Sequence, residues 1–238
     1  MVWIPPGTFT MGSPDSEPNR QSDETQHTVT LSKGFWMGKC EVTQREYQAV
    51  IGSNPSWFTG DLDRPVERVD WHDATNYCAK LTTSERSAGR LPSGYVYRLP
   101  TEAEWEYGCG AGTTTATAFG DSLSSTHANF NGDSAYNGAA KGPYLKTTTK
   151  VGSFPSNAWG LYDMHGNVWE WCQDWYGSYP GGSVTDPQDP SSGWWIPVRV
   201  IRGGSWGSGG RLCRTAYRSA YNQDFNRMGF RVVLAPGP

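Results

Sequence analysis

The sequence predicts an α+β domain in which a small mixed β-sheet and a few helices are joined by much irregular loop. The 238 residues include 12 Trp, 12 Tyr and 8 Phe, although hydrophobic residues make up only 36% of the chain. Disordered chains lack aromatic residues, so this composition indicates an aromatic core. The 29 Gly and 16 Pro indicate many defined turns. Strand-like segments at both ends and helical segments in the middle complete the α+β pattern.

Charge and hydropathy exclude several classes of protein. The net charge is −3, and the 20 basic and 23 acidic residues are intermixed, so no basic stripe marks a nucleic-acid interface. No apolar stretch approaches the roughly 18 residues that span a bilayer. The first residues do not have the pattern of a signal peptide. With no break in composition and no internal repeat, we expect residues 1–238 to form a single domain.

Short strands are indicated by alternation or by aromatic and β-branched enrichment. They are expected at residues 3–12, 26–31, 35–38, 150–154, 169–171, 199–206 and 229–234. Because such segments lie near both ends of the chain, we expect the ends to share one sheet.

Three helix starts are marked by N-cap residues. Thr43 and Glu46 have the spacing of a capping box, in which two orphan backbone N–H groups are satisfied reciprocally. Thr101 and Glu104 repeat that spacing, and Asp70 is the expected cap of a helix between them. The helices are therefore expected to begin directly after residues 43, 70 and 101.

Residue types that serve catalysis are present but scattered. The four histidines, His27, His72, His127 and His165, lie far apart, which disfavours a metal oxygenase site. His165 lies in a Gly-Asn turn, where we expect it to bond to backbone. Glu102 and Glu104 are expected to complement a helix macrodipole rather than to act as an acid and base pair. No G-x-S-x-G elbow indicates a serine hydrolase.

Residues 163–170 have the composition of a calcium-binding loop. Asp163 and Glu170 offer carboxylates, and Gly166 and Val168 offer backbone carbonyls, which are the oxygen ligands that Ca²⁺ takes. The alternative is a tight turn in which Glu170 pairs with an arginine. The spacing alone favours that alternative.

The cysteines do not form a recognisable framework. They are Cys40, Cys78, Cys109, Cys172 and Cys213, without a C-x-x-C pair, so structural zinc and thioredoxin-like redox chemistry are disfavoured. An isolated cysteine is most often a small buried hydrophobe.

Motifs along nearly the whole chain together resemble the formylglycine-generating-enzyme (sulfatase-modifying-factor) domain. They lie at residues 4–13, 41–47, 65–71, 97–107, 160–171, 202–206, 214–218 and 229–231. The resemblance implies a C-type-lectin-like fold. It also implies that Asp163, Gly166, Val168 and Glu170 match a calcium site of the family, which reverses the preference drawn from spacing. Asn129 matches part of a second calcium site, whose later aspartate has no clear counterpart, so no second site is expected.

The resemblance also implies where catalysis would occur. Enzymes of the family bind copper through two cysteines between the Gly-Gly-Ser-Trp and Arg-x-Ala-x-Arg motifs, whereas residues 207–213 contain only Cys213. One thiolate cannot make the linear two-sulfur site that Cu(I) prefers. We therefore expect no copper and no catalysis. The alternative is a copper-dependent formylglycine-generating oxidoreductase that acts on a sulfatase cysteine. Cys109 and Cys213 are expected either to form a disulfide with each other or to be free thiols.

The region of about residues 199–238 resembles the C-terminal variable region of proteins diversified by retroelements, of the type found in Treponema. The residues between its framework motifs are the expected ligand-binding positions. They are Ser208, Gly209, Gly210, Arg211, Leu212, Tyr217, Ser219, Ala220, Tyr221, Asp224, Phe225 and Asn226. Tyr, Phe and Arg give a large contact area at low entropic cost, as in antibody paratopes.

The leading hypothesis is therefore a non-catalytic, receptor- or adhesin-like ligand-binding protein. Its partner is expected to be a macromolecule, most simply a protein, and the chain is expected to be monomeric. We expect the protein to be exported to the cell surface, by way of a signal or lipid anchor that this sequence does not contain. A sugar-binding lectin is a third possibility, although the sequence has no Glu-Pro-Asn or Gln-Pro-Asp motif.

Overall fold

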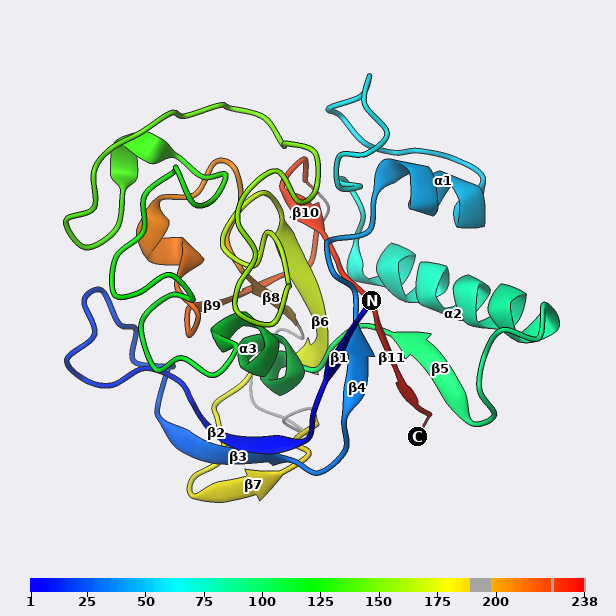
Figure 1. The fold of residues 1–238 in the computed structure, drawn as a ribbon, viewed down its shortest axis with the longest axis horizontal. Helices are drawn as coiled ribbons and strands as arrows, with labels where there is room; N and C mark the ends of the chain where they lie inside the picture. The colour runs from blue at the N-terminus through cyan, green and yellow to red at the C-terminus, as the bar shows by residue number, and fades with distance from the viewer. Residues whose placement is uncertain (189–197, 224, 238) are drawn as a thin grey trace.

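The computed structural model describes residues 1–188, 198–223 and 225–237 (Figure 1). Its first four-stranded sheet has the order β1-β4-β11-β5, and every pairing in it is antiparallel. These strands are β1 (Val2–Ile4), β4 (Phe35–Met37), β11 (Val233–Pro236) and β5 (Tyr95–Arg98). The expectation that segments near both ends of the chain share one sheet is confirmed, because β1 and β11 flank β4.

The second four-stranded sheet carries the C-terminal region and has the order β10-β6-β8-β9. Its strands are β10 (Met228–Gly229), β6 (Trp169–Trp175), β8 (Arg199–Arg202) and β9 (Arg218–Tyr221). The β10–β6 pair is parallel and the other two pairs are antiparallel.

A three-stranded sheet lies at the bottom of the view in Figure 1 and has the order β2-β3-β7. It consists of β2 (Gly7–Met11), β3 (His27–Leu31) and β7 (Ser183–Thr185). The helix α3 lies between this sheet and the second sheet, and it contacts β2, β6 and β8.

Within the described residues, three α-helices begin where the N-cap signals predict. They are α1 (Gln44–Ile51), α2 (Trp71–Ser87) and α3 (Glu102–Gly110). All three have a complete capping box, including one at α2 that the sequence analysis did not identify, between Asp70 and Asp73. Two short 3₁₀ helices follow, η1 (Gly132–Ser134) and η2 (Gly210–Cys213).

Three strand predictions are wrong, and one of them is the strand expected at 229–234, which is divided into β10 and β11 by the non-strand residues 230–232. Residues 150–154 form a turn region, and the strand expected to run to residue 206 ends at Arg202. The cause of this early end is the backbone at Gly203 and Gly204, whose φ angles of 90° and 76° cannot continue a strand. The strands β5, β7 and β9 were not predicted.

The core is aromatic, as the composition predicts. Trp105 and Trp171 are among the largest fully buried side chains, and Phe35 and Phe230 are buried beside them in the two main clusters. Among the helices that the structure describes, none is long and apolar enough to cross a membrane.

Candidate functional site

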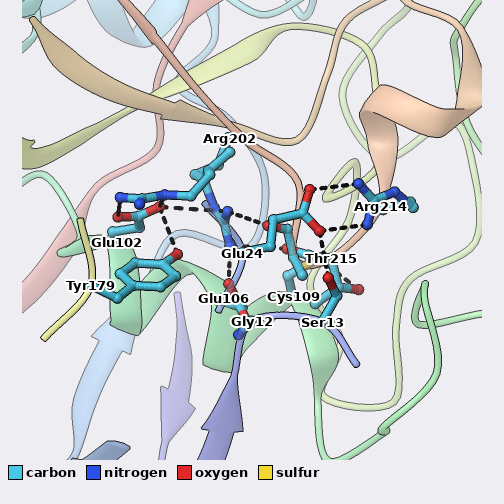
Figure 2. Close-up of polar contacts among 12 residues, drawn as sticks. Gly12, Ser13, Glu24, Glu102, Glu106, Cys109, Tyr179, Arg202, Arg214 and Thr215 are labelled. Carbon is cyan, nitrogen blue, oxygen red and sulfur yellow. Dashed lines mark hydrogen bonds and ion pairs between the residues drawn. The ribbon is translucent and has the colours of Figure 1, made fainter. Parts of the chain in front are cut away.

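Buried ion pairs connect the C-terminal region, from residue 199 onward, to the rest of the molecule (Figure 2). Arg218 donates two hydrogen bonds to the carboxylate of Glu102, at 2.8 and 2.6 Å. Arg202 forms an ion pair with Glu106, which lies one turn further along α3. Although burial raises the pKa of Glu102, the neighbouring Arg218 and Arg202 outweigh it and hold that pKa below its usual value. The first two turns of α3 therefore anchor β8 and β9.

A second set of ion pairs ties the N-terminal loop to the same region. Arg214 donates to both carboxylate oxygens of Glu24, at 2.8 and 2.6 Å, and it also pairs with Glu17. The hydroxyl of Ser13 donates to Glu24 at 2.6 Å and completes the arrangement. The arginines Arg202, Arg214 and Arg218 are all at most 3% exposed. The framework of the C-terminal region is thus held from inside, independently of the side chains that face outward.

The twelve expected ligand-binding positions differ in exposure. Tyr221 and Phe225 are 39% and 43% exposed, their ring centroids lie 5.4 Å apart, and Arg211 is also exposed. The half-buried members are Gly209, Leu212, Tyr217, Ser219, Ala220 and Asn226. Asp224 lies outside the described residues.

Ser208 and Gly210 are buried and do not reach the surface. The Ser208 hydroxyl accepts a hydrogen bond from the Ser205 backbone N–H at 3.0 Å. A Cβ atom at Gly210 would lie 2.9 Å from the Tyr136 backbone nitrogen. Both positions therefore belong to the framework in this structure. Tyr217 also packs inward, with its ring centroid 6.0 Å from that of Trp169.

A small aromatic cavity of 110 Å³ opens beside Tyr221. Its walls include Trp71, Trp171 and Trp175. The guanidinium carbon of Arg199 lies 3.7 Å from the ring centroid of Trp71 and 3.4 Å from that of Trp175. The lining also includes the polar residues Asp70, His72 and Asn222. A pocket with aromatic walls and a polar rim is of the kind that receives an anchor side chain at a protein interface.

Other surface residues beside the expected positions were missed. Trp57, 65% exposed, lies in the loop after α1, and the ring of its neighbour Phe58 contacts the ring of Trp206 at 5.4 Å between centroids. The indole N–H of Trp206 donates to the Asn226 carbonyl at 2.8 Å. The sequence could have indicated that Trp57 is exposed, because this large aromatic residue lies in a loop rich in Gly, Pro and Ser.

Cys213, in the interval where the family's enzymes have their cysteine pair, is fully buried. Burial raises the pKa of its thiol well above the usual range. All five cysteines are free thiols, so Cys109 and Cys213 are not joined. The sulfur of Cys109 instead lies 3.8 Å from the Thr215 hydroxyl.

His165 is bonded to backbone on both sides, which confirms the expectation for this residue. Its Nδ1 lies 2.7 Å from the Cys213 carbonyl oxygen, and its Nε2 accepts from the Ala118 N–H at 3.1 Å. Burial lowers the pKa of His165 to about 4. The imidazole is therefore neutral at physiological pH, with its proton on Nδ1.

Both carboxylate oxygens of Glu170 accept hydrogen bonds from side chains. Arg231 donates to both of its carboxylate oxygens at 2.6 Å, and the Trp105 indole N–H donates at 2.8 Å. This is the arginine pairing that the spacing of residues 163–170 favours.

Asp163 lies in a different environment that fits a hard cation. One of its oxygens accepts from the Gly152 N–H at 2.6 Å, whereas Asp163 Oδ1, Glu41 Oε2 and Asn129 Oδ1 are buried without a hydrogen-bond partner in the described structure. Burial raises the pKa of Asp163 to about 6. Unpartnered buried oxygens of this kind are the ligands that Ca²⁺ prefers.

Glu41 is the residue of this group that the sequence analysis missed. In the part of the chain that the structure describes, no three His, Cys, Asp or Glu side chains converge on a metal position. A bound cation would therefore need amide or backbone oxygens as well as carboxylates. Gly166 allows the close approach of this loop to Asn129, because a Cβ atom there would lie 2.4 Å from the Asn129 carbonyl oxygen.

Comparisons with known proteins agree with this architecture. The chain is similar to Treponema denticola variable protein 1, with a TM-score of 0.83 and 28% identity, covering 100% of this chain and 95% of that one. It is 32% identical over 244 residues to the chaperone protein LppX of Paenibacillus barcinonensis, covering 88% of this chain and 81% of the relative. It is 36% identical over 171 residues to the formylglycine-generating enzyme of Streptomyces coelicolor, covering 69% of this chain and 47% of that enzyme.

The structural likeness to the variable protein extends over the whole chain, which has the expected C-type-lectin-like fold. The model of the sulfatase-modifying factor enzyme 1-like domain matches residues 1–236. The chain therefore belongs to the formylglycine-generating-enzyme, or sulfatase-modifying-factor, family.

Proposed function

We propose that this chain is a non-catalytic ligand-binding protein whose C-terminal surface binds a macromolecular, protein partner. The observation that carries the proposal is the pair of exposed rings, Tyr221 and Phe225, on a framework that buried arginines hold from inside. Aromatic residues on a rigid support are the residue types that dominate protein interfaces. The aromatic cavity beside Tyr221 supplies a place for an anchor residue of the partner.

The similarity to Treponema denticola variable protein 1 supports a function in which this surface varies. We propose that a retroelement diversifies the outward-facing positions and that the protein acts at the cell surface. Framework contacts of Arg202, Arg214 and Arg218 tolerate such variation, because they depend on residues of α3 and of the N-terminal loop. A near-identical template repeat and a reverse transcriptase beside the gene are the expected genomic signs, and the lack of both would contradict diversification.

Selection from a library tests the binding function directly. Arg211, Tyr221 and Phe225 are randomised together, the variants are displayed, and binders are selected against a purified test protein such as lysozyme. Binders are expected because these exposed side chains leave the framework intact. A control library of the same size randomises three exposed residues elsewhere, Lys33, Ser87 and Lys141, and is expected to yield none. Equal yields from the two libraries would contradict the proposal.

The second candidate function is a copper-dependent formylglycine-generating oxidoreductase, which the similarity to the Streptomyces coelicolor enzyme favours. The test incubates the protein with copper and a peptide that contains a sulfatase-type cysteine, and mass spectrometry follows the peptide. No conversion to formylglycine is expected, because residues 207–213 supply one buried thiol instead of two. Turnover that Cys213→Ser abolishes would establish the enzyme.

A further inference from the structure

Residues outside the predicted variable set extend the ligand-binding surface beyond Tyr221 and Phe225. Arg68 donates its backbone N–H to the Phe225 carbonyl at 3.1 Å, which places the segment after the α1 loop beside the backbone of Phe225. Arg227 lies over the Trp206 ring, with its guanidinium carbon 4.7 Å from the centroid. We call Trp57, Arg68, Tyr221, Phe225 and Arg227 the arginine–aromatic surface.

The two arginines of this surface are exposed. Among the described residues, neither Arg68 nor Arg227 forms an ion pair, in a chain whose net charge is −3. Arg68 also has a left-handed backbone with φ of 61°, which is uncommon outside glycine and concentrates at functional positions.

Two acidic residues near the same loops already have ion-pair or hydrogen-bond partners outside this surface. Asp63 pairs with Arg45 at 3.0 Å and with Lys150 at 3.3 Å. Glu67 is buried and accepts from the Phe58 N–H at 2.7 Å. Burial raises the pKa of Glu67, and the charge of the nearby Arg68 partly offsets that rise. Because no ion pair holds Arg68 or Arg227 within the described residues, both guanidinium groups remain available beside exposed rings.

We propose that the partner of this surface is an acidic protein segment, in which carboxylates alternate with apolar side chains. The proposal rests on the proposed function, because it names the chemistry of the partner at that same surface. Carboxylates would pair with Arg68 and Arg227, since an arginine fork matches a carboxylate in charge and geometry. Apolar side chains would pack on Trp57, Tyr221 and Phe225, where complementary charge fixes the register.

Selection from a random dodecapeptide phage library on the immobilised full chain tests this chemistry. Enrichment of sequences that combine Asp or Glu with Trp, Leu or Phe is expected. Enrichment of neutral or basic sequences would overturn the acidic-partner inference and leave the proposed binding function standing. A library that returns nothing above background would count against both.

Substitutions then locate the most enriched acidic peptide on the surface. Arg68→Gln and Arg227→Gln are each expected to weaken its binding about tenfold, the loss expected for one charge-assisted contact. Lys33→Gln removes the same charge from the exposed turn before β4 and is the matched control, with Kd expected within about twofold of the parent. Thermal melting of each variant shows that the fold is kept. Equal weakening by all three substitutions would indicate unspecific attraction and overturn the site.

The ionic strength dependence separates charge pairing from apolar contact. The Kd of the acidic peptide is expected to rise steeply between 50 and 300 mM NaCl, because exposed charge pairs are screened by salt. The Arg68→Gln and Arg227→Gln double variant is expected to lose most of that dependence. A salt dependence that the double variant keeps would place the peptide elsewhere on the molecule.

Discussion

Buried arginines are the residues on which this fold depends most clearly. Arg231 is fully buried, donates to both oxygens of Glu170, and also reaches the carbonyls of Gly38 and Tyr162 at 3.0 and 2.9 Å. One side chain thereby satisfies a buried carboxylate and two backbone groups from separate segments. Removing it would leave an uncompensated charge in the core.

Arg231→Met should therefore destabilise the protein severely. We expect a loss of about 3–5 kcal/mol in the free energy of unfolding, measured by urea denaturation, because Glu170 stays buried without its partner. Arg90→Met is the control, since Arg90 pairs with Glu85 on the surface and should cost less than about 1 kcal/mol. Similar losses for the two variants would refute the structural role given to Arg231.

His165 makes stability fall in mild acid. Its pKa in the folded protein is about 4, lowered by burial from its usual value of 6.5, so the unfolded chain takes up a proton before the folded one does. Its contribution is lost as the pH falls from about 6.5 to about 4, by roughly 3 kcal/mol in all. Asp163, whose pKa is raised by burial, acts in the opposite direction over part of this range.

The measurement compares unfolding free energies of the parent and of His165→Gln at pH 7 and pH 4.5. The difference in unfolding free energy between the two proteins should be smaller at pH 4.5 than at pH 7. The reason is that only the parent contains His165, whose protonation in the unfolded chain lowers stability. A constant difference would show that the imidazole is not buried in its neutral form.

The sequence predicts residue types at the site better than it predicts their directions. Spacing indicated that Glu170 pairs with an arginine, but the partner is Arg231, which lies 61 positions away and is identified only by the fold. Tyr217 was expected at the contact surface, yet its ring packs partly against Trp169. The direction of a side chain in an irregular segment depends on tertiary packing. The local sequence alone does not determine that direction.

At the scale of elements, local chemistry explains what was predictable. The starts of α1, α2 and α3 follow from caps that involve residues only three positions apart. The strand β5 escaped prediction because its partner, β11, is distant in the sequence. The strand β9 escaped prediction because the mostly irregular residues 203–217 separate it from its partner, β8. All four residues of β5 are half-buried, so no alternation marks it.

The turn after β8 is closely packed. Gly204 has a φ of 76°, and a Cβ atom there would lie 2.5 Å from the Cys213 sulfur. Gly204→Ala should therefore cost more than about 2 kcal/mol, from both backbone strain and overpacking. Gly160→Ala has a similar φ of 80° but open space around it, so only the strain of about 1 kcal/mol is expected. Equal losses of stability for Gly204→Ala and Gly160→Ala, in thermal or urea unfolding, would contradict the close approach of Gly204 to the Cys213 sulfur.

At the scale of the whole molecule, the loops of residues 110–168 converge on a small group of buried oxygens. Asn129 donates to the Asn167 side chain at 3.2 Å, and Asn167 donates to Glu41 at 3.1 Å. Asp163 lies beside Glu41, and after burial itself this carboxylate is the next cause that raises the pKa of Glu41. A cation among these oxygens would join the central loops to the segment before α1.

We propose that Ca²⁺ binds the folded chain through Asp163 and Glu41. Adding Ca²⁺ at a hundred times its Kd should stabilise the fold by about 2.7 kcal/mol, and a chelator should lower the melting temperature accordingly. Asp163→Asn and Glu41→Gln are expected to abolish that response, whereas Asp15→Asn, on the exposed N-terminal loop, should keep it. An unchanged melting temperature with and without Ca²⁺ would rule out the site.

The place of β11 in the first sheet has a consequence for synthesis on the ribosome. This strand lies between β4 and β5, which are bonded to each other only through it, and it follows every other element of the described chain. Until it emerges, β4 and β5 each leave an unpaired edge, a form prone to association with other chains. The first sheet therefore closes only after the twelve expected ligand-binding positions have been translated, so a substitution there that disturbs the pairing of β11 would leave both edges open.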